Sequence, residues 1–568
     1  MAAARPRFNP SRCNATADVD PLRLYGNENV AWTPLITCSA DFPAALFEHT
    51  VSQLIHHPEY NSTLILRSEV IQDSVDGFPD LVPVLQDLQP VRNIHRKLLP
   101  RRPTRDSGLE QHCTLYVPSS SSHLTDAESL HPTVLVLTPL LPPDGVLPYY
   151  HPTVTHLAFR FVPPTTSSDS ATLCIEVIPL PETSLDPGAR LYRTCLSLLE
   201  TLHRYGWGAL TQYKKRVEHD VLVPREIYQD LYLIMRERHK HLVNDWREVT
   251  DPLKHVFEDI GIATFLMLLW KDTYGPETIP SDPDPVAAPN TTEAPVPASL
   301  DVEPWRRWPR PPGGFVDLGC GNGLLTHILV SEGYAGYGID LRARTSWTHY
   351  PRSTQSCLLV RALDPTRVLP TERRRRQPVS SPRPSDTGDN DAEADGTTNI
   401  TDSGDNSRYT AEDLALDVLL PTGCFLIGNH ADELTPWVPP LATRSLASGY
   451  LSIPCCAWSF DARFDRARDV PFCAVDAETL NLGTGGEGAV SSSYAHYRVW
   501  LAALSVHCGW AVEVEMLRIP STRNWAIVGR RRVGSLDAAD RNVEELIEGV
   551  RKRGQFKTRR PEGKAGDH

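Results

Sequence analysis

The spacing of hydrophobic positions changes twice along this chain of 568 residues. Up to about residue 220, short apolar runs such as 133–138 and 157–161 alternate with turns rich in Pro and Asp, which indicates strands. From 222 to 273 apolar residues recur at helical spacing, and nearly every position beyond Ile260 is apolar, which predicts a buried helix. From Gly314 the order becomes strand, glycine turn, helix and strand, which is typical of a parallel α/β sheet.

These changes divide the chain into five expected regions. An α+β region at 1–221 is followed by a helical segment at 222–273, which packs on the domain after it, and by a disordered linker at 274–313. The α/β domain at 314–535 and a C-terminal helix with a basic tail at 536–568 complete the chain. A polar insertion at about 371–410 interrupts the α/β domain, and its composition cannot form a core. A chain of this length is too long for one hydrophobic core, so at least two folded units are expected.

The strand-to-helix turn that follows Gly314 is the most informative stretch of the sequence. It reads Gly314-Phe-Val-Asp-Leu-Gly-Cys-Gly-Asn-Gly323 and leads into an apolar helix. The glycines at 319, 321 and 323 permit a tight turn whose backbone N–H groups face a ligand. The next strand, 334–339, ends in Asp340, where a carboxylate can accept hydrogen bonds from ribose hydroxyls.

An acidic residue before the glycines decides between two classes of ligand. Asp317 would repel the pyrophosphate of a dinucleotide, whereas it would attract the ammonium group of S-adenosylmethionine, so we expect the latter as cofactor. A tight turn that binds no ligand is the alternative. Leu363-Asp364 follows the apolar stretch 358–360 and either closes over the adenine or is a plain strand end. The expected cofactor-binding residues are Asp317, Gly319, Gly321, Gly323, Asp340, Asp364 and Asn429.

Two later strands lead into clusters of polar and thiol groups. The strand 424–428 leads into Asn429-His-Ala-Asp-Glu433, and the strand 449–453 leads into Pro454-Cys-Cys456. Ligands of open α/β sheets bind at the carboxyl ends of the strands, so the first cluster should lie beside the transferable methyl group. An amphipathic helix at about 497–508 and a terminal hairpin at 512–528 complete the expected sheet.

Six motifs occur in a fixed order along the chain. They are Lys254-His-Val-Phe-Glu-Asp259, Asp317-Leu-Gly-Cys-Gly-Asn-Gly323, Gly338-Ile-Asp340, Ile427-Gly-Asn-His-Ala-Asp-Glu-Leu-Thr-Pro-Trp437, Pro454-Cys-Cys456 and Arg518-Ile-Pro-Ser-Thr522. In this order they strongly resemble the motifs of the tRNA (uracil-2′-O-)-methyltransferases. The resemblance covers about residues 85–530, apart from the two polar segments described above.

The resemblance implies a fold, an activity and partners. It implies a Rossmann-like, class I S-adenosylmethionine methyltransferase sheet in a cytoplasmic eukaryotic enzyme. The expected product is a 2′-O-methylated ribose at uridine 44, at the base of the variable arm of serine tRNA. Some relatives carry a C-terminal Cys/His zinc finger, whereas this chain ends in a basic tail, so no metal is expected. Neither DNA nor a membrane is an expected partner.

Transfer of a methyl group to a ribose hydroxyl requires that the oxygen be placed near the sulfonium methyl and lose its proton. His430, Asp432 and Glu433 are the candidates for orienting or deprotonating it, and His430 could act as a base near neutral pH. Equally, His430 and Asp432 could only cap the following helix and hold Asn429. No Lys-Asp-Lys-Glu set can be assigned from the spacing, so the base stays open.

Two other functions fit the sequence. A C5-pyrimidine RNA methyltransferase would use Cys455 as a thiolate nucleophile, although small buried cysteines are common in protein cores. A non-catalytic RNA-binding protein with a methyltransferase fold is the other possibility. The presence of Asp317, the glycine turn and Asp340 argues against it.

Charge and composition limit the possible partners. The formal net charge of −13 is unusual for an RNA-binding protein, but seven acidic and no basic residues lie between Asp386 and Asp405. Local basic patches decide phosphate binding, and the candidates are 91–103, 213–216 and the tail beyond Arg551. The longest apolar run, 260–270, is too short to span a bilayer, and the first residues lack the apolar centre of a signal peptide. The twelve cysteines show no repeated spacing, which favours free thiols in an intracellular protein.

Overall fold

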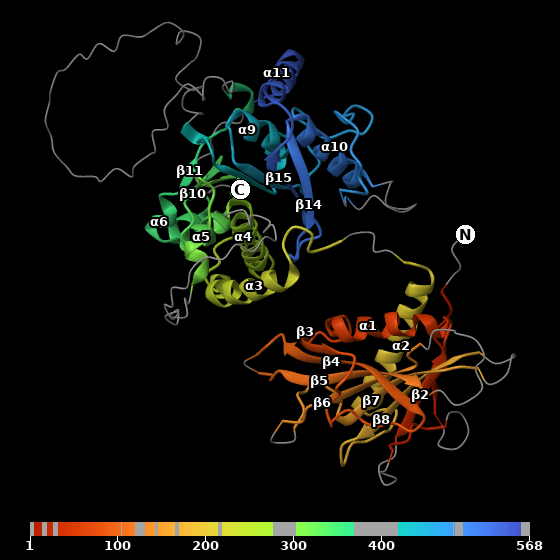
Figure 1. Ribbon diagram of the computed structural model, residues 1–568. Helices are drawn as coiled ribbons and strands as arrows, with labels where there is room; N and C mark the ends of the chain where they lie inside the picture. Colours follow the sequence, from red (N-terminus) through yellow and green to blue (C-terminus); the bar gives the residue numbers. More distant parts are fainter. Residues whose placement is uncertain are drawn as a thin grey trace, which may run out of the picture. The chain divides into compact units, whose positions relative to one another are not determined.

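The computed structural model describes most of the chain. The described residues are 5–13, 20–25, 32–103, 105–119, 131–142, 146–164, 170–213, 218–275, 303–368, 418–480, 482 and 492–557. Contacts between residues divide the chain into two compact units, Met1–Lys214 and Lys215–His568, each of which is described by itself (Figure 1). The predicted insertion at 371–410 lies outside the described residues.

The first unit is built on an antiparallel sheet of eight strands in the order β1-β2-β8-β7-β6-β5-β4-β3. The strands are β1 Ser11–Arg12, β2 Thr33–Ser39, β3 Ile65–Ser74, β4 Leu88–Pro100, β5 Leu109–Pro118, β6 Val134–Pro139, β7 Val154–Val162 and β8 Thr172–Pro179. Strands β6 and β7 contain the apolar runs 133–138 and 157–161, so the prediction of strands there is confirmed.

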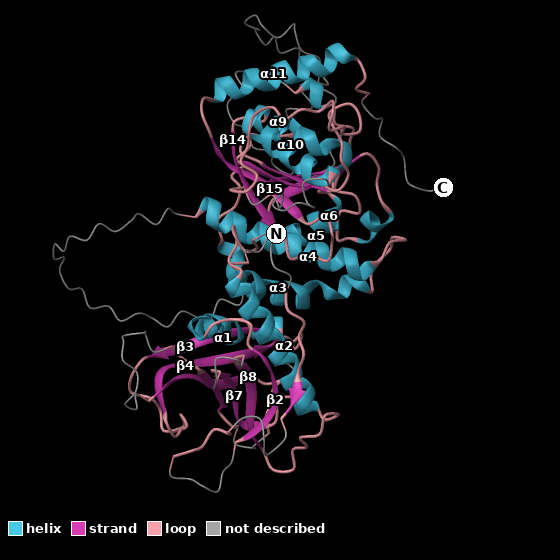
Figure 2. Cartoon of the chain, turned by 90° about the vertical axis from the view of Figure 1, so that its right-hand side faces the viewer, coloured by secondary structure: helices cyan, strands magenta, loops and turns pink. Residues whose placement is uncertain are grey.

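Two helices, α1 (Phe47–His56) and α2 (Arg190–Leu210), cover one face of this sheet (Figures 1 and 2). Apolar side chains of both helices pack against alternate residues of the strands, such as Cys113 and Leu115 of β5. Two 3-10 turns, η1 Ala44–Leu46 and η2 Pro58–Tyr60, flank α1. A smaller cluster around Tyr116 lies on the opposite face of the sheet.

The second unit contains a sheet of seven strands in the order β11-β10-β9-β12-β13-β15-β14. The strands are β9 Phe315–Leu318, β10 Gly336–Asp340, β11 Leu358–Val360, β12 Phe425–Asn429, β13 Gly449–Ile453, β14 Trp510–Met516 and β15 Trp525–Arg532. Neighbouring strands pair in parallel along the order β11, β10, β9, β12 and β13, whereas β15 runs antiparallel to both β13 and β14. The predicted parallel sheet and its terminal hairpin are therefore confirmed.

Helices cover both faces of the second sheet (Figure 2). One face carries α3 Arg225–His239, α4 Pro252–Tyr274 and α5 Leu324–Ser331, and the other carries α9 Val438–Arg444, α10 Ser493–His507 and α11 Leu536–Arg553. Side chains alternate between the two layers: Phe425 and Ile427 pack with α4 and α5, whereas Leu426 packs with α9 and α10. The shorter elements are α6 Arg352–Gln355, η3 Lys240–Val243, η4 Pro304–Arg307, η5 Thr345–His349, η6 Pro365–Arg367 and η8 Asp432–Trp437.

Helix α4 is the predicted buried helix. It begins at Pro252, and the side chain of Asp251 accepts a hydrogen bond from the backbone N–H of Leu253. Every residue from Ile260 to Trp270 is buried. The ring of Trp270 lies 5.4 Å from that of Phe425, centroid to centroid, so the helix packs directly on the sheet. Within the described residues, no helix is both long and apolar enough to cross a membrane.

Residues 276–302 of the predicted linker lie outside the described residues, whereas residues 303–313 pack on the second unit and were not correctly predicted. The side chain of Trp305 is only 1% exposed. Its indole N–H donates to a carboxylate oxygen of Glu332, at 2.7 Å. The prediction was wrong here because it depended on the Pro- and Asp-rich composition of the whole segment and gave no weight to Trp305, which packs on the second unit.

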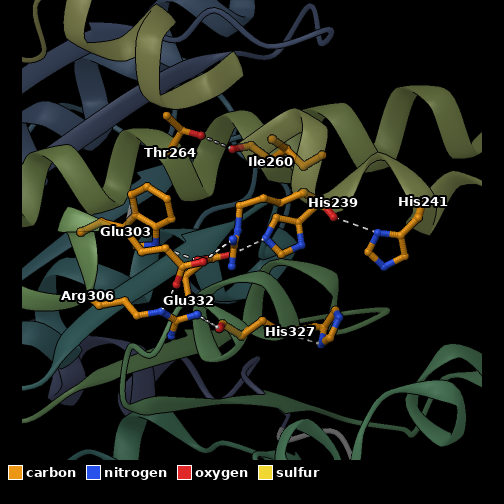
Figure 3. Close-up of polar contacts among 11 residues, drawn as sticks. His239, His241, Ile260, Thr264, Glu303, Arg306, His327 and Glu332 are labelled. Atoms are coloured by element: carbon orange, nitrogen blue, oxygen red, sulfur yellow. Dashed lines mark hydrogen bonds and ion pairs between the residues drawn. The ribbon is translucent and has the colours of Figure 1, made fainter. Parts of the chain in front are cut away.

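Glu332, which follows α5, connects three separate segments of this layer (Figure 3). Its buried carboxylate accepts hydrogen bonds from Trp305, from Nε of Arg238 (2.9 Å) and from Nε2 of His239 (2.7 Å). Burial by itself would raise the pKa of Glu332, but these donors outweigh it and lower the pKa to about 2. Arg238 also contacts Glu303, so the end of α3, η4 and α5 are held by one charged network.

Replacing Glu332 by alanine should destabilise the second unit by about 1–3 kcal/mol for each of the two buried donors, His239 and Trp305, that lose their acceptor. Arg238 is partly exposed and keeps its contact with Glu303. Ionised Glu332 stabilises the fold above its ordinary pKa of 4.5, and this stabilisation is lost as the pH falls toward about 2. Urea unfolding followed by tryptophan fluorescence should therefore show a smaller loss of stability over that pH range in Glu332→Ala than in the parent. Glu237→Ala, which removes an exposed ion pair with Lys240, is the control. An equal effect of both substitutions would contradict this assignment.

Candidate active site

Parallel pairing brings the functional motifs to one edge of the second sheet. Asp317 of β9 pairs with both Gly338 of β10 and Ile427 of β12, and Asn429 at the end of β12 pairs with Ile453 at the end of β13. Because all these strands point the same way, the residues that follow them meet at their carboxyl ends. The glycine turn, Asp340 and the polar clusters after β12 and β13 therefore share one end of the unit.

The glycine turn is present as predicted, and its three glycines adopt a left-handed backbone. The φ angles of Gly319, Gly321 and Gly323 are +70°, +55° and +75°. The N–H groups of Gly319 and Cys320 donate to the carbonyl of Ile339, at 2.8 and 3.0 Å, rather than to a ligand. The prediction that the turn's N–H groups face a ligand was wrong for these two, because the turn must first close against β10.

A cavity of about 470 Å³ lies over this end of the second unit. One end is formed by Gly319, Gly321 and Asp340 with the apolar side chains of Ile339 and Leu363. The same cavity extends to the other predicted cluster and is lined there by His430, Asp432 and Glu433. Glycine, a carboxylate and apolar groups thus share one cavity with the residues expected to face the acceptor.

Gly321 faces this cavity most openly. A Cβ atom built there would have no neighbour within 4 Å, so the space beside it belongs to the cavity. Its N–H donates to Oδ2 of Asp340 at 2.9 Å, while Oδ1 of Asp340 accepts from the N–H of Arg342 at 3.2 Å. Asp340 is thereby fixed at the cavity wall, where its remaining lone pairs can accept from a ligand.

Four of the predicted cofactor residues are not among those that line the cavity. They are Asp317, Gly323, Asp364 and Asn429. Gly323 begins α5, and a Cβ there would lie 2.9 Å from the Leu358 side chain, so the glycine is needed for packing. Asp364 caps η6 by accepting from the N–H of Thr366, at 3.0 Å, and from its hydroxyl. Its carboxylate thus matches the strand-end alternative, whereas its neighbour Leu363 does line the cavity.

A cluster of carboxyl groups is buried behind the glycine turn. Oδ2 of Asp317 accepts from the hydroxyl of Thr326 at 3.1 Å, but its buried Oδ1 has no partner among the described residues. Burial, with a smaller effect of Asp340, raises the pKa of Asp317 to about 7. Burial and the neighbouring Glu258 and Asp317 also raise the pKa of Asp259 well above its ordinary value.

This cluster fits a cationic ligand. Buried carboxyls without a counter-charge are held in their protonated form, and a nearby cation would favour ionisation. S-adenosylmethionine carries a sulfonium and an ammonium group, and the open face of Gly321 leaves room beside the turn. The residues present therefore fit this cofactor, with Gly319, Gly321 and Asp340 at the cavity wall and Asp317 behind it.

His430 is held by helix α4. Its Nε2 lies 3.0 Å from Oε1 of Glu258, and its buried Nδ1 has no partner among the described residues. Burial would raise the pKa of Glu258, but hydrogen bonds from His430 and Ser521 outweigh it and lower the pKa. Asn429 is held separately, through its Nδ2 and Oδ1 of Asp259, at 3.3 Å. Among the described residues, His430 and Asn429 thus have separate side-chain partners on α4.

Glu258 and Asp259 end the sequence motif 254–259, and the sequence alone predicts no role for either acid. Both are buried in α4 among apolar residues, where Glu258 contacts His430 and Asp259 contacts Asn429, both of the motif 427–437. A pair of adjacent acids in an otherwise apolar helix is a signal that could have identified them, since unpaired charges are rarely buried. Their partners are more than 160 residues away in sequence, so pairing could not be predicted.

Cys455 lies beside the acceptor cluster but is poorly suited to nucleophilic attack. Its Sγ donates to Oδ1 of Asp432, at 3.2 Å. Burial and the carboxylate of Asp432 raise the pKa of the Cys455 thiol to about 12. A covalent C5 mechanism needs a thiolate, so the site disfavours that alternative.

The basic segment 91–103 is largely strand β4, and two of its arginines are engaged within the first unit, whereas Arg101 and Arg102 are exposed. Arg92 pairs with Asp73 at 2.7 Å, and Arg96 is fully buried, donating to Gln111 and to backbone carbonyls of α1. The interpretation of this segment as phosphate-facing was wrong for Arg96, because that strand residue points into the core. Arg92 is partly exposed, but its charge is paired with acids of the same unit. Of the segment 213–216, only Tyr213 lies within the described residues.

Placing a side chain at Gly321 should block cofactor binding without unfolding the protein. In Gly321→Arg the new side chain enters the cavity, so calorimetry should detect no S-adenosylmethionine binding. Gly534→Arg is the matched control, because Gly534 has a φ of +73° and equally open space but does not line the cavity. Both variants should carry similar backbone strain. Unchanged affinity in a folded Gly321→Arg protein would contradict the assignment.

Cofactor affinity should depend on pH through Asp317. Because the fold raises its pKa to about 7, the group must lose a proton to attract a cation, and affinity should rise as the pH increases through 7. Calorimetry in buffers of different ionisation enthalpy should therefore detect release of a proton from Asp317 when the cofactor binds below pH 7. In Asp317→Asn, binding should be weaker above pH 7 and nearly independent of pH. A pH dependence that survives in Asp317→Asn would exclude this role.

Both parts of the chain match known family profiles. Residues 10–216 match a profile described as "TRM44-like, N-terminal bet v1-like domain". Residues 222–282 and 298–365 match one described as "Predicted AdoMet-dependent methyltransferase". The second match includes the buried helix α4 and the glycine turn.

Relatives similar over nearly the whole chain bear one name, tRNA (uracil-O(2)-)-methyltransferase. The protein of Neurospora crassa is 32% identical over 95% of this chain and 94% of its own length. That of Schizosaccharomyces pombe is 34% identical over 91% and 89%, and that of Saccharomyces cerevisiae is 29% identical over 86% and 84%. The predicted resemblance is confirmed: the chain belongs to the tRNA (uracil-O(2)-)-methyltransferase family of S-adenosylmethionine-dependent enzymes.

Proposed function

We propose that this protein transfers the methyl group of S-adenosylmethionine to the 2′-hydroxyl of a uridine ribose in tRNA, at position 44 of serine tRNA, in the cytoplasm. The observation that carries the proposal is the single cavity that joins Gly321 and Asp340 to Asp432. A cofactor bound at the first end would present its methyl group toward the second. The names of the relatives support tRNA and the uridine oxygen as the targets.

The order of strands supports a Rossmann-like, class I methyltransferase fold. Strands β10, β9, β12 and β13 are adjacent and parallel, and the hairpin of β14 and β15 closes one side. Chain order reverses at β9, since β10 and β11 lie on one side of it and β12 and β13 on the other. Ligands of open α/β sheets bind at such a switch point, which is where the glycine turn lies.

At the cofactor end, each residue has a distinct part. Asp340 would accept hydrogen bonds from the ribose hydroxyls of the cofactor, and Leu363 would pack against its adenine. Asp317 would favour the positively charged methionine portion. Burial raises the pKa of its carboxyl to about 7, and a nearby cation would favour the ionised carboxylate. The bound cofactor supplies an electrophilic methyl group on its sulfonium sulfur.

At the acceptor end, Asp432 is the group best placed to hold the ribose hydroxyl. It lines the cavity and is exposed, whereas Nε2 of His430 is engaged by Glu258 and its Nδ1 is buried. His430 is therefore a positioning residue that fixes the loop carrying Asp432. Both residues have a positive φ, +52° and +45°, and such strain occurs where the surrounding structure imposes a conformation.

The mouth of the cavity offers charges for the tRNA backbone. Arg361 and Lys557 line it and are exposed. Lys557 belongs to the basic tail that the sequence indicated as a contact for phosphates. These side chains would attract the RNA despite the acidic net charge, because local patches decide phosphate binding.

The site of methylation tests the proposal directly. Serine tRNA from cells that lack this protein is incubated with purified enzyme and cofactor, digested with nuclease and analysed by mass spectrometry. We expect a 2′-O-methylated uridine at position 44. A methyl group on the base, or on another tRNA position, would refute the proposal.

Loss of the Asp432 carboxylate should slow turnover far more than it weakens cofactor binding. We expect Asp432→Asn to lower kcat by roughly 10²–10⁴-fold, the usual range for a group that assists proton transfer. Asp272→Asn is the control, because it removes only an exposed contact with Arg530. A turnover in Asp432→Asn equal to that of the control would show that Asp432 does not act on the acceptor.

A further inference from the structure

A group of three potential metal ligands lies at the acceptor end of the second unit. The carboxylate of Asp432 and the thiols of Cys455 and Cys456 have one ligand atom each within 4.8 Å of one another. Oδ1 of Asp432 and Sγ of Cys455 are 3.2 Å apart. The sequence alone predicts no metal, because the basic tail lacks a zinc finger and these three ligands are brought together only by the fold.

The sheet creates this group. Asn429 at the end of β12 pairs with Ile453 at the end of β13, so the chain segments that leave the two strands run side by side. Asp432 follows the first strand and the two cysteines follow the second. The hydroxyl of Tyr494, from α10, donates to the carbonyl of Pro454 at 2.7 Å and fixes the turn that carries the cysteines.

The two cysteines are badly placed for a disulfide. Adjacent Cα atoms in a trans chain are about 3.8 Å apart, which is below the range of about 4.4–6.8 Å found in ordinary disulfides. The described cysteines, including this pair, are free thiols. Two neighbouring thiols that converge with a carboxylate, but do not suit a disulfide, are better explained by a common ligand.

The chemistry of the donors identifies that ligand. Thiolates select soft or borderline cations such as Zn²⁺ over Mg²⁺ and Ca²⁺, which prefer oxygen. Zinc accepts Cys and Asp ligands and is usually four-coordinate, and zinc sites with three protein ligands keep a fourth position for water or substrate. Asp432 lines the cavity, whereas the two cysteines are not among its lining residues, so we expect an open position to face the cavity.

We propose that Asp432, Cys455 and Cys456 bind a thiophilic divalent cation, Zn²⁺, whose fourth position is open to the cavity. A hydroxyl bound at that position would release its proton to water more readily, because a bound cation lowers the pKa of coordinated oxygen. This consequence rests on the proposed function, since it takes the ribose hydroxyl as the fourth ligand. The site itself does not.

Cobalt is the probe for the site. Full-length protein is freed of metal with a chelator and titrated with Co²⁺, and the near-ultraviolet absorption from thiolate-to-cobalt charge transfer is recorded. We expect one equivalent of Co²⁺ to bind, with that absorption, and Zn²⁺ to displace it. Failure of the parent protein to develop this absorption would overturn the proposal.

Variants assign the absorption to these residues. The double variant Cys455→Ser/Cys456→Ser should lose it, and Asp432→Ala should weaken Co²⁺ binding by at least about tenfold, since even the loss of an outer-shell partner costs 10–100-fold. Cys357→Ser/Cys473→Ser is the matched control, because both of these thiols are partly buried and lie outside the group. Circular dichroism and S-adenosylmethionine affinity verify folding. Absorption that survives in the first double variant would contradict the proposal.

Failure of this proposal can be told apart from failure of the proposed function. Ribose methylation by metal-free parent protein, at the rate of the zinc-loaded protein, would leave the function standing and overturn a role for the cation in it. Stoichiometric binding of Co²⁺ through both cysteines, in a protein whose product is a methylated base, would support the site and refute the ribose assignment.

Discussion

The parallel pairing of β9 with β10 and β12, and of β12 with β13, is the constraint on which the site depends. It places the carboxyl ends of these strands together, so segments more than a hundred residues apart form one cavity wall. The hairpin of β14 and β15 then pairs antiparallel with β13 and completes the sheet. Helices buried on both faces keep this arrangement fixed, because each strand residue packs against one layer or the other.

Two buried acids of this unit illustrate how partners decide the charge of a group. Glu332 accepts hydrogen bonds from three donors, and its pKa is lowered to about 2. Asp317 accepts from the hydroxyl of Thr326, and burial raises its pKa to about 7. The first carboxylate is satisfied by the fold alone and stabilises it. The second lies behind a glycine turn and has no counter-charge among the described residues, and a cationic cofactor would supply one.

Much of the second unit could be predicted from sequence, because its signals are local. The glycine turn needs positive φ angles that only glycine adopts cheaply, and the apolar run of α4 can only be buried. The strand Gly449–Ile453 was predicted with its observed bounds. These features depend on neighbours in the chain, where periodicity and residue type are informative.

The features that were missed depend on contacts between distant residues. Glu258 and Asp259 gain their roles only when α4 meets the end of β12, and Trp305 is buried where its N–H donates to Glu332. The sequence predicted Arg96 to be part of a basic patch, but its position in β4 directs the side chain into the core. Asp432, Cys455 and Cys456 were singled out separately, yet their convergence follows from strand register, which the sequence pattern does not specify.

The central claim is that one cavity holds the cofactor and presents its methyl group to the residues after β12. A crystal structure of the protein with bound S-adenosylhomocysteine, the product form of the cofactor, tests it most directly. We expect the ribose hydroxyls at Asp340, the adenine against Leu363 and the sulfur directed toward Asp432. A ligand bound outside this cavity, or one whose sulfur faces away from Asp432, would contradict the claim.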